Sequence, residues 1–235
     1  MSGAAGASGA IGFDFDHTLG VDGGLERRAL YAYAGELGRP LDPDDGAWRA
    51  RVEALLGAFR DGATTMDAMI AAFAEQLGVR GATAERWREH CYLLVDALAR
   101  PIDGACALLA SLRAHGIPVA ILTNGWSPLQ QKKIARALGA ESTGLTILVS
   151  DALQAVKPSR EAFDALVASL GVARECCWYV GDNARGDVGG ALAAGLRAVW
   201  FDAEGQVYPA DLPPPTLRIT ALRELETLTQ NALDP

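Results

Sequence analysis

Positive charge is scarce in this sequence of 235 residues: 21 lysines and arginines face 29 acidic residues, giving a net charge of −8. Such a deficit disfavours nucleic acid and anionic membrane surfaces as partners, because both would be repelled. Cysteine is scarce too, with four residues and no C-x-x-C pair of the kind that binds metal. The adjacent Cys176 and Cys177 are expected on a buried strand as small apolar residues, and a reducing cytoplasmic location is predicted.

Uninterrupted apolar runs long enough to span a bilayer are missing as well, so no membrane span is expected. Residues 1–10 are rich in glycine, alanine and serine and contain no basic residue. We therefore expect a loose tail there rather than a signal peptide. Half of all residues are hydrophobic, which is ample for a buried core and argues against disorder.

Two kinds of pattern divide the chain. Residues 21–100 show helical periodicity and almost no strand signal, with helices expected at Leu25–Leu37, Gly46–Phe59, Thr65–Leu77 and Thr83–Ala99. From Pro101 onward, strands alternate with helices, which predicts a parallel sheet. The expected fold is α/β: a Rossmann-like parallel sheet core from 11–20 and 101–235, with a helical cap domain inserted after the first strand. Its later helices are predicted at Ala105–His115, Ser127–Leu138, Arg160–Leu170, Gly186–Ala194 and Ala221–Gln230, and its later strands at Pro118–Leu122, Leu145–Val149, Cys177–Val180, Ala198–Phe201 and Leu217–Ile219.

The first expected strand ends in the run IGFDFDHTLG, residues 11–20. In a strand, Ile11, Phe13 and Phe15 would point to one face, while Asp14 and Asp16 would share the other. Ligands of open α/β sheets bind at the carboxyl ends of the strands, where these two acids would lie. Asp-x-Asp alone is a weak signal, because turns are often rich in aspartate.

Three later loops carry polar residues in similar positions: Thr123 with Asn124, Lys157, and Asp182 with Asp187. Each loop also has an ordinary structural interpretation. Thr123 and Asn124 could form a turn, Lys157 could be a surface lysine, and the last pair could be a helix cap and a charge in the first helical turn. Together with the first two aspartates they would gather four carboxylates. Two unit charges ~4 Å apart repel by about 4 kcal/mol at an effective dielectric of roughly 20. A hard divalent cation with oxygen ligands, such as Mg²⁺, would relieve that repulsion.

In this order, the segments DFDHTL, LTNG, VKPS and VGDNARGD resemble the four motifs of the haloacid dehalogenase superfamily, and the similarity extends from about Ile11 to Leu228. The helical block resembles the all-helical, C1-type cap that this family inserts after its first motif. The resemblance implies a Mg²⁺-dependent hydrolase of small phosphate monoesters that works through an aspartyl-phosphate. Alternatives are a phosphomutase acting on a sugar phosphate, a 2-haloacid dehalogenase, or a catalytically idle binding protein.

The resemblance also suggests a role for each motif residue. Asp14 is the expected nucleophile, Asp16 the acid that protonates the leaving oxygen, and Lys157 a fixed positive charge on the phosphate. Thr123 and the backbone N–H of Asn124 are expected to bind the phosphate together with Lys157. The implied metal ligands are the carboxylates of Asp14 and Asp182 and the backbone carbonyl of Asp16, supported by Thr18 and Asp187.

Particular residues separate the branches of this family. Dehalogenases lack the second acid of the first motif, so Asp16 argues against that chemistry. A carbon–phosphorus hydrolase needs a cap lysine, but the three lysines (Lys132, Lys133 and Lys157) all lie outside 21–100. A small phosphorylated metabolite is the expected partner; nucleotide, sugar phosphate and phosphoglycolate stay open, as do a homo-oligomer and the role of His17. Cap residues that could contact the substrate are Arg27, Arg28, Tyr31, Arg51 and Arg60.

Overall fold

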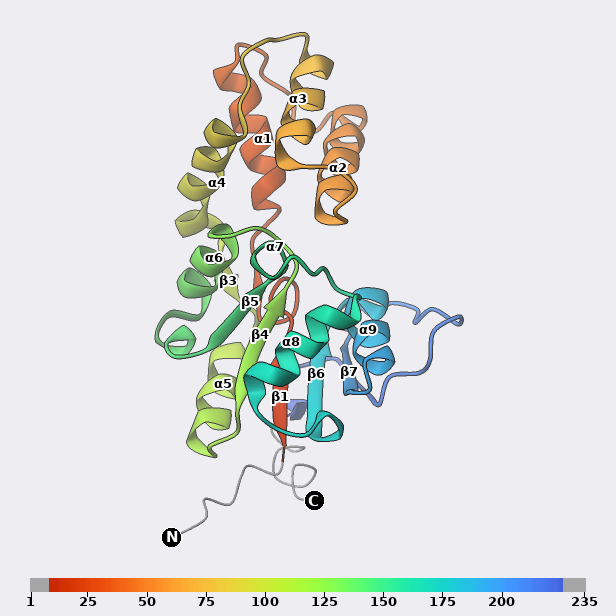
Figure 1. Ribbon diagram of the computed structural model, residues 1–235. Coiled ribbons are helices and arrows are strands. Elements are labelled where there is room, and N and C mark those ends of the chain that lie inside the picture. Colours follow the sequence, from red (N-terminus) through yellow and green to blue (C-terminus); the bar gives the residue numbers. More distant parts are fainter. Residues whose placement is uncertain (1–8, 226–235) are drawn as a thin grey trace. The chain divides into compact units, whose positions relative to one another are not determined.

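The computed structural model describes residues 9–225 and divides the chain into two compact units (Figure 1). One unit combines the described residues of Met1–Val21 and Arg100–Pro235, and the other is Asp22–Ala99. The predicted tail 1–10 lies largely outside the described range, although Ala10 already belongs to the first strand. No helix within 9–225 has both the length and the apolar character needed to cross a membrane.

The first unit contains a six-stranded, wholly parallel sheet, which confirms the predicted Rossmann-like α/β class. Its order is β5-β4-β1-β6-β7-β8, so the first strand lies near the centre, hydrogen-bonded to β4 and β6. A parallel sheet with both faces covered requires strands that are apolar on both sides. The strands are β1 (Ala10–Phe13), β4 (Val119–Thr123), β5 (Thr146–Val149), β6 (Cys177–Gly181), β7 (Arg197–Phe201) and β8 (Leu217–Ile219).

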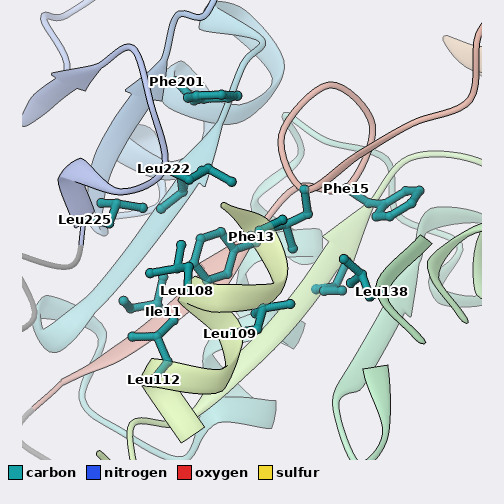
Figure 2. Packing of buried hydrophobic residues seen from close by; sticks show 14 of the residues in the cluster. Ile11, Phe13, Phe15, Leu108, Leu109, Leu112, Leu138, Phe201, Leu222 and Leu225 are labelled. Atoms are coloured by element: carbon teal, nitrogen blue, oxygen red, sulfur yellow. The ribbon is translucent and has the colours of Figure 1, made fainter. Parts of the chain in front are cut away.

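Helices cover both faces of this sheet, and alternate residues of each strand contact opposite layers. Ile11 and Phe13 of β1 pack with Leu108 and Leu112 of α5 (Ala105–Ala114), as Figure 2 shows. Phe15 lies in the same cluster, so the predicted apolar face of the first segment is confirmed. A second cluster joins the other face to further helices. The helices that contribute to the two clusters are α5 and α6 (Leu129–Leu138) on one side and α8 (Arg160–Leu170) and α9 (Gly190–Ala193) on the other.

The second unit consists of four helices close to those predicted. Thr65 and Thr83 cap two of them, their hydroxyls accepting bonds from the N–H groups of Ala68 and Arg86, as expected for N-cap residues. Gly78 ends a helix in the left-handed conformation, with φ of 67°. The helices are α1 (Leu25–Glu36), α2 (Gly46–Arg60), α3 (Met66–Leu77) and α4 (Ala84–Leu98); short antiparallel strands β2 (Gly20–Val21) and β3 (Arg100–Pro101) flank the insertion.

Several boundaries differ from the prediction. The expected helix Gly186–Ala194 begins earlier, as a wide π-turn over Ala184–Gly189, because the Asn183 side chain accepts bonds from two following N–H groups. One short helix, α7 (Ser150–Leu153), was not expected, nor were the 3₁₀ turns Gly139–Ser142 and Arg174–Cys176. The predicted last helix, Ala221–Gln230, extends outside the described residues.

Candidate active site

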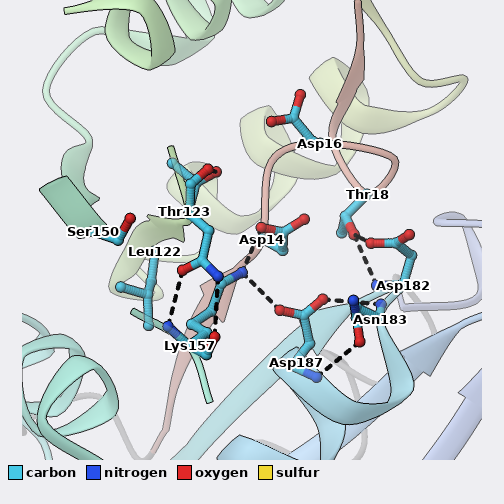
Figure 3. A network of polar contacts seen from close by, with 12 residues as sticks. Asp14, Asp16, Thr18, Leu122, Thr123, Ser150, Lys157, Asp182, Asn183 and Asp187 are labelled. Atoms are coloured by element: carbon cyan, nitrogen blue, oxygen red, sulfur yellow. Dashed lines mark hydrogen bonds and ion pairs between the residues drawn. The ribbon is translucent and has the colours of Figure 1, made fainter. Parts of the chain in front are cut away.

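The carboxyl ends of three adjacent strands bring distant segments of the chain together. Asp14 follows β1, Thr123 ends β4, and Asp182 follows β6, and these strands are neighbours in the order β4-β1-β6. Lys157 reaches the same place from the loop between α7 and α8. Figure 3 shows these side chains around Asp14. Four segments with separate sequence signals therefore meet at one edge of the sheet.

A tight turn after β1 separates the two aspartates of the first segment. The strand ends at Phe13, and the carbonyl of Phe15 then accepts bonds from the N–H groups of residues 18, 19 and 20. As a result the Asp14 carboxylate pairs with Lys157, whereas the Asp16 carboxylate pairs with a different lysine, Lys133. The two carboxylates do not share one strand face (Figure 3). Alternation fails here because it applies only while the backbone stays extended.

The ammonium of Lys157 is buried and held by three oxygens. Its Nζ lies 2.6 Å from Asp14 Oδ1, 2.7 Å from Asp187 Oδ1 and 2.9 Å from the Tyr179 hydroxyl. That hydroxyl in turn donates to the carbonyl of Leu122 at 2.8 Å. Burial alone would lower the pKa of Lys157, but the two carboxylates raise it well above its ordinary value. The site therefore contains a permanent, fixed positive charge.

Three carboxylates surround that ammonium. Oxygens of Asp14, Asp182 and Asp187 all lie within 4.8 Å of one another. Burial raises the pKa of Asp14 well above its ordinary range, and burial with the nearby Asp187 raises that of Asp182 to about 6. One ammonium leaves an excess of negative charge in an all-oxygen environment. That donor set fits a hard divalent cation.

Neighbouring residues fix the positions of Asp182 and Asp187. The hydroxyl of Thr18 accepts the N–H of Asp182 at 3.1 Å, and the Trp200 indole donates to the Asp182 carbonyl at 2.9 Å. The second oxygen of Asp187 accepts the N–H of Asn183 at 3.0 Å. Asp187 thus bridges the lysine and the loop after β6, which leaves little freedom to the acidic cluster.

Gly181 permits the close approach of Asp187, because a Cβ atom at Gly181 would overlap the Asp187 side chain. We expect Gly181→Ala to lower the free energy of unfolding by about 1–3 kcal/mol, since the anchored carboxylate has no room to move. Urea denaturation measures this change. Gly57→Ala is the matched control: it lies inside α2 in open space and should stabilise by about 0.5–1 kcal/mol. Equal unfolding midpoints for Gly181→Ala and the wild type would contradict the packing described.

Asn124 joins the second loop to the third. Its side-chain oxygen accepts the N–H of Lys157 at 2.9 Å, and its amide donates to the carbonyl of Lys157 at 3.1 Å. The neighbouring Thr123 hydroxyl donates to the Asn124 carbonyl at 3.3 Å and accepts from Gln130 at 3.0 Å. The two hydrogen bonds between the Asn124 side chain and Lys157 fix the backbone of Lys157. This role of the asparagine side chain was not predicted from sequence.

The sequence model of the haloacid dehalogenase-like hydrolase family matches residues 9–195, which include all four of these segments. The chain belongs to the haloacid dehalogenase-like hydrolases. This is the family that the four sequence motifs resemble.

Curated relatives of this haloacid dehalogenase-like hydrolase include a phosphoserine phosphatase from Thermus thermophilus, which is 38% identical over 160 residues, or 65% of this chain and 61% of the relative. The pyrimidine 5'-nucleotidase YjjG of Escherichia coli is 32% identical over 138 residues, 57% of this chain and 60% of the relative. The matches thus span about three fifths of the length of these relatives. The magnesium-bound structure of the HAD-hydrolase YfnB from Bacillus subtilis has a TM-score of 0.73 at 24% identity, covering 94% of this chain and 98% of that one.

Three residues of this haloacid dehalogenase-like hydrolase contact the motif side chains but were not predicted from sequence. Tyr179 contacts Lys157, while Gln130 and Lys133 of α6 contact Asp16. One signal was available: Gln130 and Lys133 share the buried face of α6 with Leu129, Ile134, Ala137 and Leu138. Polar residues at apolar-face positions of an amphipathic helix need buried partners.

Among the candidate cap residues of this haloacid dehalogenase-like hydrolase, the arginines contact partners within the helical unit. Arg27 lies 2.6 Å from Glu53, and Arg60 lies 2.7 Å from Glu26. The guanidinium of Arg51 lies 5.1 Å from the centre of the Trp48 ring. These arginine side chains therefore connect or stabilise helices of the second unit. That any of them contacts the substrate stays a prediction.

Proposed function

We propose that this chain hydrolyses small phosphate monoesters in a Mg²⁺-dependent reaction, through an aspartyl-phosphate on Asp14. The observation that carries the proposal is the buried Lys157 ammonium, 2.6 Å from the Asp14 carboxylate. An anion that attacks an anionic phosphoryl group needs such fixed positive charge beside it. We further propose that the helical unit, Asp22–Ala99, is the cap that selects the substrate.

In the first half-reaction, an oxygen of Asp14 attacks the phosphorus atom and the bond to the leaving oxygen breaks. Asp16 transfers its proton to that oxygen, which departs as an alcohol. The Thr123 hydroxyl, the N–H of Asn124 and the Lys157 ammonium bind the phosphoryl oxygens. The contacts between Asn124 and Lys157 support this role, because they fix the distance between the phosphate-binding donors of the two loops.

In the second half-reaction, water attacks the phosphorus atom of the aspartyl-phosphate. Asp16, now a carboxylate, takes a proton from that water, and the phosphorus–oxygen bond to Asp14 breaks. Asp14 and a protonated Asp16 are regenerated, and inorganic phosphate is released. Asp14 is the nucleophile of the first half-reaction and the leaving group of the second, while Asp16 is first a general acid and then a general base. This proton transfer in both halves accounts for a second acid two residues after the nucleophile.

The residues that would hold Mg²⁺ are Asp14 and Asp182 through their carboxylates and Asp16 through its backbone carbonyl. The cluster of carboxylate oxygens within 4.8 Å and the raised pKa values of Asp14 and Asp182 support this fit, since the negative charge there is under-compensated. When bound, the cation neutralises charge on the phosphoryl oxygens. Thr18 and Asp187 would support the ligands through their contacts with Asp182 and Lys157.

Phosphate ester hydrolysis is favoured over the alternatives by the second acid. Dehalogenases also share the fold, at 20% or 21% identity, so the fold alone does not choose the chemistry. A dehalogenase has no leaving alkoxide to protonate, whereas Asp16 is present here and held by two side chains. An idle binding protein would not need this acid and a buried lysine beside the same strand end. A phosphomutase shares these residues and differs in shielding the aspartyl-phosphate from water.

Metal removal tests the proposal. We expect the chain to release phosphate from p-nitrophenyl phosphate, with a loss on the order of 100-fold or more when EDTA is added, and recovery with Mg²⁺. Protons should compete with the cation, because the pKa of Asp182 is raised to about 6. The Mg²⁺ concentration for half-maximal activity should therefore rise as the pH falls through about 6. Undiminished turnover in EDTA would overturn the metal requirement, and a panel of phosphorylated metabolites would identify the substrate.

A further inference from the structure

One face of α6 presents two polar side chains to the carboxylate of Asp16. Lys133 Nζ lies 2.6 Å from Asp16 Oδ1, and Gln130 Nε2 lies 2.8 Å from Asp16 Oδ2. Each oxygen of the carboxylate therefore has its own donor. The two donors are one helical turn apart on a helix of ten residues, so their separation is set by the helix backbone.

Lys133 is an unusual residue for this position. Its side chain is 4% exposed, and its ammonium also lies 5.7 Å from the centre of the Phe15 ring. A buried ammonium is costly unless an anion compensates it, and a well-packed apolar side chain in its place is often neutral or stabilising. Fold stability alone thus gives no reason for a lysine here, whereas orientation of Asp16 does.

Gln130 connects Asp16 to the second motif. The same amide nitrogen lies 3.0 Å from the Thr123 hydroxyl and 2.7 Å from the Asn124 carbonyl. Gln130 is 3% exposed, so its amide is held in place by packing as well as by these acceptors. The geometry therefore couples the position of Asp16 to the loop that is proposed to bind the phosphoryl group.

We propose that Gln130 and Lys133 are positioning residues that hold the Asp16 carboxyl in line with the leaving oxygen. This inference rests on the proposed function, because it assumes that Asp16 delivers the proton. Without Lys133 the carboxyl of Asp16, whose side chain is 31% exposed, can turn toward water. Proton delivery then becomes inefficient, while Asp14 and Lys157 keep their arrangement.

Two aryl esters of similar shape separate this role from a structural one. The ratio kcat/KM covers the steps up to release of the leaving group; nitrophenolate departs without a proton, and phenolate needs one. In Lys133→Met and Gln130→Met we expect kcat/KM for phenyl phosphate to fall about 10- to 100-fold, below the full effect of a general acid. The value for p-nitrophenyl phosphate should fall less than about threefold. Lys132→Met, an exposed neighbour on the same helix, is the control and should leave both values unchanged.

Asp16→Asn provides the reference, with a still larger difference between the two esters. Equal losses on both esters in the Lys133 and Gln130 variants would overturn the positioning role and assign these residues to the fold. Gln130→Met carries the test alone if the lysine variant does not fold. If the wild type releases phosphate from neither ester, the proposed function itself fails and this inference with it.

Discussion

Asp14→Asn should reduce phosphate release from p-nitrophenyl phosphate by at least about 10⁴-fold, because the substitution removes the proposed nucleophile. Asparagine has nearly the same shape as aspartate, and Lys157 keeps its contact with Asp187 at 2.7 Å. The fold should therefore survive while the chemistry is lost. The measurement is the steady-state rate of phosphate release at saturating Mg²⁺, together with a circular dichroism spectrum of each protein.

The matched control for this change is Asp211→Asn. Asp211 forms an ion pair with Arg185 at 2.8 Å, in which both side chains are more than half exposed. Such a pair contributes little, so the control should retain its rate within about twofold. A folded Asp14→Asn protein with a rate within tenfold of the wild type would refute Asp14 as the nucleophile.

Lys157→Met should affect both stability and activity. The ammonium is 4% exposed and neutralises Asp14 and Asp187, so its removal leaves two buried carboxylates uncompensated next to Asp182. We expect the free energy of unfolding to fall by about 3–5 kcal/mol. Phosphate release should fall by about 10³-fold, because one fixed charge on the transferring phosphoryl group is lost.

Magnesium ions separate these two effects of Lys157→Met. Binding of the cation to the acidic cluster should raise the urea midpoint of the variant more than that of the wild type, because more negative charge is then uncompensated. It should not restore the rate, since the lysine is proposed to contact the phosphoryl oxygens itself. Lys132→Met is again the control. A variant with an unchanged midpoint and a rate within tenfold of the wild type would contradict the account of this site.

The parts of the site that could be predicted from sequence are those attached to strand ends. Buried strands such as β4 and β6 have apolar residues on both faces. Thr123, the last residue of β4, and Asp182, the first residue after β6, therefore stand out in the pattern as polar residues. Parallel topology then requires these strand ends to meet at one edge of the sheet. Helix starts such as the one at Thr65 were predictable for a related reason, because the bonds that cap a helix are local.

The residues that could not be predicted act through long-range contacts. Lys133 and Asp16 are 117 positions apart, and a helical pattern alone does not show which carboxylate a lysine will reach. The Asn124 side chain resembled a turn residue, although it binds the backbone of Lys157. The divergence of Asp14 and Asp16 was missed because strand alternation was extended three residues beyond the end of β1, from Phe13 to Asp16.

Rapid acid quenching during turnover tests the central claim most directly. Enzyme, Mg²⁺ and p-nitrophenyl phosphate are mixed, stopped within one turnover, digested and examined by tandem mass spectrometry. We expect one phosphoryl group on the peptide that contains Asp14, located on Asp14 itself and absent from the Asp14→Asn protein. Phosphate released at the same rate with no phosphoryl group on Asp14, or with the group on another residue, would contradict it.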